Sequence, residues 1–377
     1  MVNHPLTLTL CGAALLLLGA EATQPSEATQ PSEATQAAPE TSPADAPMAL
    51  LAEADREWTD ATLVSSILFA LGEPKPDHWR EPDPDLARAG EEIFRLGRTT
   101  QADGKKTQRM APAYECTDCH NTVREDPDLR VSDPEARLTY AIENDLPFLP
   151  GTTVYGIVDR TSWFNDDYVK KYGALVEPAN HSLVGATKLC SKECSQGRYP
   201  TDWEMEAVLT YFWTLGLTWG DLPADGISLA MAETVAKRGS EAQKEGALAE
   251  ARGKFLSASP ATFGDKPESY GKGAPGYGLE GDPERGAAIY RRSCLHCHDK
   301  GGVVFLHKFK DKTCSYKSLY RGSADKGIES YYHVIREGTK PAFDKYMPLF
   351  PLERMSDQQV EDLRAWIDQQ AAPKKRN

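Results

Sequence analysis

Two short motifs place two cysteines and a histidine at a spacing that suits one chemistry. They read CTDCH at 116–120 and CLHCH at 294–298. A Cys-x-x-Cys-His motif lets two thiols reach the two vinyl groups of one porphyrin while the adjacent imidazole binds the iron. A Cys-x-x-Cys without the histidine would also suit a zinc site or a redox disulfide. Because the histidine follows both pairs, we predict two covalently attached haem c groups.

The predicted haem sites divide into thioether positions and iron ligands. The thioether positions are Cys116, Cys119, Cys294 and Cys297. The proximal iron ligands are His120 and His298.

The same helical signals flank both motifs. Before them, Asp83-Pro84 and Asp282-Pro283 each open an amphipathic stretch with the residues of a helix start. After them, Thr201 and Ser356 each begin a run with a capping-box pattern and apolar residues at helical spacing. The chain therefore contains one unit twice: a first helix, a haem motif, a middle of variable length and an aromatic-rich last helix.

The repeated unit resembles a class I c-type cytochrome domain, over about 86–220 and 279–372. The resemblance implies an all-α fold, in which the first and last helices of each unit cross and hold a haem between them. It also implies that the chain is a dihaem cytochrome c with two tandem domains.

The rest of the chain separates into distinct segments. We expect a signal peptide at 1–22, a disordered linker at 23–47 and an N-terminal cytochrome c domain with insertions at 48–222. A connector at 223–278 is helical over 225–257 and then rich in glycine and proline. The C-terminal cytochrome c domain follows at 279–372.

The distal iron ligand of the second haem has a clear candidate. Met347 is followed by Pro348 shortly before the last helix, which matches the Met-Pro ligand loop of the resembled family. His333 is the alternative ligand. A thioether ligand raises the reduction potential, so a His/Met haem suits electron transfer.

The distal ligand of the first haem stays open between several residues. When the helix starts Thr201 and Ser356 are paired, Met347 corresponds to Lys192, in the middle of LCSKECSQGR at 189–198. The cysteines on either side either form a disulfide or supply an iron-binding thiolate. A third haem motif is excluded because serine stands where the histidine is needed. The candidate ligands are Cys190, Cys194, Lys192 and His181.

Charge and the N-terminus limit the partners and the location. The net charge of −13 excludes nucleic acid and favours redox partner proteins with a basic docking face. The apolar run at 6–18 is too short for a membrane span and is typical of a signal peptide. We therefore expect a periplasmic or other extracytoplasmic protein with no membrane span after cleavage. An uncleaved N-terminal anchor is the alternative.

The function expected from these features is electron transfer between redox partners, so we predict a carrier rather than a catalyst. The main alternative is a sulfur-compound oxidoreductase that acts at the N-terminal haem. The chain resembles thiosulfate dehydrogenase and SoxA-type dihaem cytochromes more weakly, in haem count and in the cysteines near the ligand position. A peroxidase with one open iron site is a third interpretation.

Overall fold

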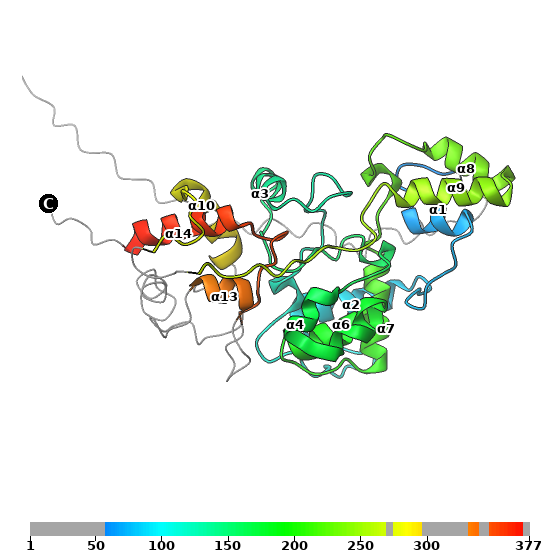
Figure 1. The fold of residues 1–377 in the computed structure, drawn as a ribbon. Helices are drawn as coiled ribbons and strands as arrows, with labels where there is room; N and C mark the ends of the chain where they lie inside the picture. Colours follow the sequence, from blue (N-terminus) through cyan, green and yellow to red (C-terminus); the bar gives the residue numbers. More distant parts are fainter. Residues whose placement is uncertain (1–56, 269–273, 296–330, 339–346, 372–377) are drawn as a thin grey trace, which may run out of the picture. The chain divides into compact units, whose positions relative to one another are not determined.

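The computed structural model describes residues 57–268, 274–295, 331–338 and 347–371, and all of them belong to one unit at 41–377 (Figure 1). In these ranges the regular structure is helical, and the only β pairing consists of isolated bridges such as Leu63 with Thr218. The predicted all-α fold is thereby confirmed. The expected signal peptide and linker lie outside the described residues, as do Cys297 and His298.

The described helices follow one another along the chain, with several short turns between the longer elements. The α-helices up to the end of the first motif's unit are α1 (Val64–Ala70), α2 (Pro84–Leu96), α3 (Pro134–Glu143), α4 (Val169–Tyr172), α5 (Glu177–Asn180), α6 (Leu183–Leu189) and α7 (Asp202–Trp213). The later α-helices are α8 (Leu229–Arg238), α9 (Glu241–Arg252), α10 (Pro283–Ile289), α13 (Tyr331–Glu337) and α14 (Asp357–Ala371). The short 3-10 turns are η3 (Cys116–Asp118), η4 (Ile157–Asp159), η5 (Asp166–Tyr168), η6 (Gly173–Val176) and η8 (Trp219–Asp221), and the π-helical turns are η7 (Cys190–Cys194) and η9 (Tyr290–Cys294).

The four helix starts that the sequence predicts are confirmed by their caps. The carboxylate of Asp83 accepts the first free N–H groups of α2, and that of Asp282 does the same for α10. Thr201 forms a capping box with Glu204 at the start of α7. Ser356 and Gln359 exchange the equivalent hydrogen bonds at the start of α14, with N···O distances of 3.0 and 3.1 Å.

Two pairs of helices cross, and at each crossing a glycine of one helix lies against the backbone of the other. α2 packs on α7 and α10 packs on α14 (Figure 1). At the first crossing Gly90 lies against the backbone of Ala207, and at the second Gly286 lies against the backbone of Asp362. A Cβ atom at either glycine would fall on the facing carbonyl oxygen. The backbones can approach this closely only because glycine has no side chain.

Apolar clusters hold these pairs and join segments that are distant in the sequence. One cluster lies between α2 and α7 and includes Phe94, Tyr211 and Phe212. Another places Phe148 and residues of α3 together with α10, α13 and α14. The part of the chain after the first motif thus contributes to the core around the C-terminal helices. The helices predicted in the connector, α8 and α9, pack against α1.

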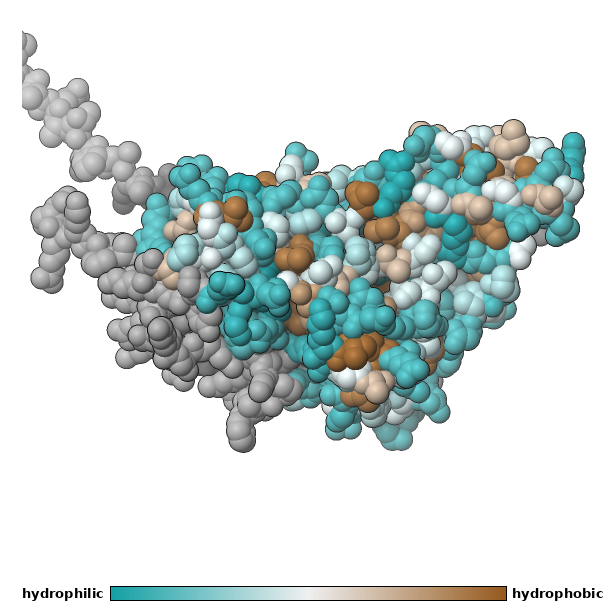
Figure 2. Space-filling model, in the orientation of Figure 1, coloured by the Kyte–Doolittle hydropathy of each residue, from teal (hydrophilic) through white to brown (hydrophobic). Residues whose placement is uncertain are grey.

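The outer face shown in Figure 2 is mostly hydrophilic, with apolar side chains in small separate spots. Large apolar side chains are instead gathered in the clusters between helices. None of the described helices has the length and apolar character that a membrane crossing requires.

Gly90→Ala tests the close helix crossing. We expect the free energy of unfolding to fall by about 1–3 kcal/mol, because the new methyl group forces α2 away from α7. Gly246→Ala is the matched control, since an added Cβ there meets open space on α9 and alanine stabilises an exposed helix by about 0.5–1 kcal/mol. Denaturant unfolding of the two variants measures both effects. If Gly90→Ala and Gly246→Ala had equal free energies of unfolding, the close packing of α2 on α7 at Gly90 would be contradicted.

The buried carboxyl group of Asp159 provides a pH test of the fold. Asp159 is 2% exposed, and its Oδ2 atom accepts the N–H of Leu217 over 2.8 Å. Burial raises the pKa of Asp159 to about 7. The folded chain therefore keeps a proton that the unfolded chain has already released at lower pH.

Because the folded pKa lies above the unfolded value of about 3.9, this group lowers stability as pH rises from about 4 to about 7. Asp159→Asn keeps an acceptor for Leu217 but cannot ionise. We expect the stability of the variant relative to the original protein to increase with pH across this window. Urea unfolding at about pH 4.5 and about pH 7.5 measures the difference. Parallel stability profiles of the two proteins would show that Asp159 does not titrate as stated.

Candidate haem site

The first Cys-x-x-Cys-His motif forms a tight turn on one wall of a cavity, which we call the first cavity. η3 begins at Cys116, and the carboxylate of Asp118 accepts the N–H of Glu115 over 2.8 Å, which closes the turn. Cys116, Cys119 and His120 all line the first cavity. The remaining walls are largely apolar and aromatic, as a planar hydrophobic macrocycle requires.

His120 is held in one orientation. Its Nδ1 atom lies 2.6 Å from the carbonyl oxygen of Thr152, so this nitrogen carries the proton and Nε2 is the nitrogen left to bind iron. Burial lowers the pKa of His120, which favours the neutral, metal-binding form. A Cβ atom at Gly151 would lie 2.6 Å from the His120 ring and from the Cys119 carbonyl oxygen. The close packing behind the histidine therefore requires glycine.

Cys190 and Cys194 lie on the wall of the same cavity. α6 continues into the π-helical turn η7, and the N–H of Ser195 bonds to the carbonyl oxygen of Cys190 over 2.9 Å. π-helical turns are frequent at functional sites because they re-aim side chains. None of the described cysteines forms a disulfide.

The two thiols interact with each other and differ in acidity. The pKa of Cys194 is lowered, chiefly because Cys190 donates a hydrogen bond to its sulfur, with further support from the hydroxyl of Tyr172 at 3.4 Å. The same hydrogen bond, followed by burial, raises the pKa of Cys190 well above its ordinary value. Within the pair, Cys194 is therefore the more acidic thiol.

The other two candidate ligands lie elsewhere. Lys192 is exposed, and its Nζ atom donates to the carbonyl oxygen of Gly197 over 3.4 Å. His181 is also exposed, and it borders a separate cavity with His78 and Asp159. Of the four predicted candidates, the cysteines alone line the first cavity.

The second motif is described in part. Cys294 ends the π-helical turn η9, and burial raises its pKa to about 12. Cys294 and Met347 pack against the same apolar cluster of the C-terminal helices. The alternative ligand His333 lies 3.2 Å from a carboxylate oxygen of Glu337, on the same helix.

Two further sets of wall residues were not predicted as site residues. Pro348 and Leu349, directly after Met347, line the first cavity, although they belong to the segment expected to serve the second haem. Arg160 also lines the cavity and donates to the carbonyl oxygen of Thr153 over 3.0 Å. Burial lowers the pKa of Arg160 to about 10, so it is a cation at neutral pH. Neither set carries a local sequence signal, because its position depends on long-range packing.

Residues 281–367 match the model of a family described as cytochrome c oxidase, cbb3-type, subunit III. The match supports a c-type cytochrome. It contains the second Cys-x-x-Cys-His and Met347, and with them it supports covalently bound haem c and haem-based electron transfer with redox partner proteins. No curated protein and no solved structure matches the chain.

The residues of the first cavity also fit a haem c. Two thiols and an imidazole with its Nε2 atom available share one wall, and two more sulfur atoms line the cavity. Thiols for thioether bonds, a nitrogen ligand and apolar walls are the groups that a c-type haem needs.

Proposed function

We propose that the protein is an exported dihaem c-type cytochrome that carries electrons between redox partners. The family match supports the C-terminal haem domain. The observation that carries the first haem is the first cavity, which Cys116, Cys119 and His120 line together with apolar side chains. The two glycine-mediated helix crossings, at Gly90 and Gly286, give further support to a repeated domain.

Each residue has a defined role in this proposal. Cys116 and Cys119 attach the first haem, and His120 binds its iron through Nε2 while Thr152 holds Nδ1. Cys294, Cys297 and His298 serve the second haem in the same way, with Met347 as its distal ligand. A bound haem supplies reversible one-electron chemistry at the iron.

We assign a thiolate of the pair formed by Cys190 and Cys194 as the distal ligand of the first haem. Both sulfurs line the cavity, are not joined by a disulfide in the structure and lie in a turn that re-aims the helix. A thiolate donates electron density to the iron and lowers its reduction potential. A low-potential first haem and a His/Met second haem give electrons a favourable direction along the chain.

The charge and the N-terminus complete the proposal. A net charge of −13 favours redox partners with a basic docking face, which it would steer by long-range attraction. The apolar run at 6–18 supports export to the periplasm or another extracytoplasmic space.

A second candidate function is oxidation of a sulfur compound such as thiosulfate at the first haem. Two observations favour it: two thiols in hydrogen-bond contact line the cavity, and Arg160 offers a half-buried cation for an anionic substrate. Reduction of the haems by thiosulfate, with turnover in the presence of an electron acceptor, would establish this activity. If thiosulfate does not reduce the haems, this second candidate function is refuted and electron transfer is the one that remains.

The haem count is the first test. Mass spectrometry of the denatured protein should find two covalently attached haems. Cys116→Ser with Cys119→Ser should remove one haem and keep the other, and Cys294→Ser with Cys297→Ser should do the reverse. Cys314→Ser is the control, because this cysteine belongs to neither motif, and it should keep both haems. A single haem in the original protein would refute the dihaem proposal.

The distal thiolate has its own spectroscopic test. The oxidised protein should give the low-spin thiolate signature in optical and electron paramagnetic resonance spectra. Cys190→Ser and Cys194→Ser, made separately, should identify the ligand, since replacing it abolishes the signature and raises the first potential. The variant of the other cysteine is the matched control and should keep the signature. If the double variant retains the original spectrum and potential, neither sulfur binds iron.

A further inference from the structure

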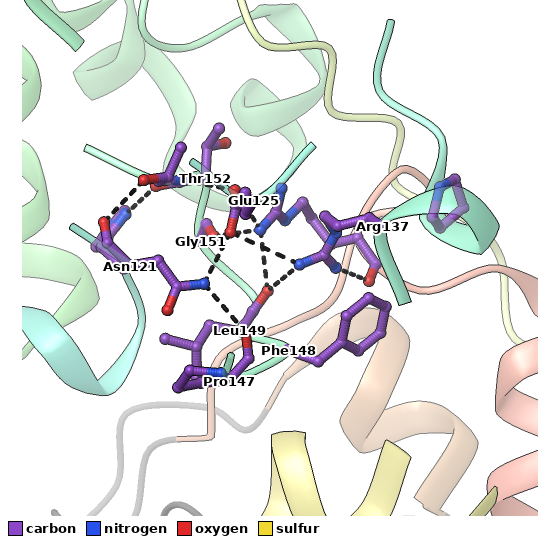
Figure 3. Close-up of polar contacts among 12 residues, drawn as sticks. Asn121, Glu125, Arg137, Pro147, Phe148, Leu149, Gly151 and Thr152 are labelled. Carbon is purple, nitrogen blue, oxygen red and sulfur yellow. Dashed lines mark hydrogen bonds and ion pairs between the residues drawn. The ribbon is translucent and has the colours of Figure 1, made fainter. Parts of the chain in front are cut away.

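A charge cluster lies buried behind the first haem motif. The carboxylate of Glu125 lies 2.7 Å from a guanidinium nitrogen of Arg354 and 3.8 Å from one of Arg137. Asn121 donates to the same carboxylate over 2.9 Å, and Figure 3 shows Glu125 between Asn121 and Arg137. The three charged side chains are 1–3% exposed. Buried charges at this depth are held in fixed positions by their partners.

This cluster holds the backbone that orients His120. Glu125 accepts the N–H of Thr153 over 2.7 Å, and Arg354 donates to the carbonyl oxygen of Gly151 over 2.8 Å. These bonds secure the residues on both sides of Thr152, whose carbonyl oxygen accepts the His120 Nδ1 proton over 2.6 Å. The cluster is thus one residue removed from the bond that fixes the imidazole.

Arg354 reaches this place from the C-terminal part of the chain. Its segment begins at Met347 and ends at the start of α14, and Pro348 and Leu349 within it line the first cavity. Arg336 of α13 secures the same segment from the other side, by donating to the carbonyl oxygens of Phe350 over 3.1 Å and Met355 over 2.8 Å.

The backbone of Arg354 is held as firmly as its side chain. Its carbonyl oxygen accepts a hydrogen bond from the guanidinium of Arg137, which also stacks over the ring of Phe148 at 3.8 Å. Both the backbone and the side chain of Arg354 are therefore fixed. Through them the C-terminal part of the chain is connected to the segment that holds His120.

We propose that Arg354 is a positioning residue for His120, through which the C-terminal domain sets the reduction potential of the first haem. This inference rests on the proposed haem in the first cavity. The strength and direction of the bond from Nδ1 determine the basicity and ring orientation of an iron-binding imidazole. The positive charge of Arg354 also disfavours the oxidised, more positive iron.

Arg354→Gln is the direct test, because glutamine is neutral and too short to reach both Glu125 and Gly151. The potential of the first haem should fall, and its electron paramagnetic resonance g-values should change as the imidazole turns. The second haem should change less. Arg354→Lys keeps the charge and places its three N–H donors on a single nitrogen, so it should restore most of the original potential and g-values.

The matched control is Arg285→Gln. Arg285 pairs with Glu135 and lies 3.4 Å from the carboxylate of Asp362, so it also joins these two parts of the chain. Among the described residues Arg285 makes no hydrogen bond or ion pair with the 151–153 segment, and its loss should leave the first potential and the g-values unchanged. An effect of Arg285→Gln equal to that of Arg354→Gln would reduce Arg354 to general support of the fold, and the inference would be overturned.

Arg354→Gln leaves Glu125 with one fewer partner, which can prevent folding. Glu125→Gln with Arg354→Gln removes one charge of each sign, so the net charge of the cluster stays the same, and the glutamine that replaces Glu125 keeps an oxygen acceptor beside Arg137. This double variant should fold, as measured by circular dichroism and haem content, and should still show altered g-values because Gly151 lacks its donor. Original g-values in the folded double variant overturn the inference. A single haem in the original protein instead refutes the proposed function, so the two failures are distinct.

Discussion

The hydrogen bond from His120 to the carbonyl oxygen of Thr152 is the interaction on which the first site depends. At 2.6 Å it fixes the ring and directs Nε2 toward the cavity. Gly151 must be glycine because the ring packs directly on it, and Glu125 and Arg354 hold the chain on both sides. The His120 ring is thus oriented by a chain of contacts that extends from the motif to Arg354, just before α14, rather than by the motif alone.

The elements that local chemistry specifies are those that the sequence predicts well. Helix starts at Asp83 and Thr201 carry their own capping groups. The crossing of the helix pairs is implied by the resemblance to class I c-type cytochrome domains, and the structure shows that Gly90 permits it. Glu125 and Arg354 give no such signal, because isolated charges in a sequence are expected at the surface. Their burial depends on partners that are distant in the chain, and only the folded structure brings these together.

In the turn of LCSKECSQGR, the residue paired with Met347 and the residues that line the cavity are different ones. Pairing the last helices places Lys192 opposite Met347, but residues four apart share a helix face while the residue between them points away. Cys190 and Cys194 accordingly line the cavity, whereas Lys192 is exposed. The π-helical turn adjusts this geometry further, and no feature of CSKEC predicts it. Sequence pairing located the turn, and helix geometry selected the side chains.

The two proposed haem sites share one stretch of backbone. Met347 packs with the C-terminal cluster, its neighbours Pro348 and Leu349 line the first cavity, and Arg354 supports the histidine there. The proposed ligand of the second haem and the proposed positioning residue of the first therefore lie on one segment of the chain, so a displacement of this segment would affect both proposed sites.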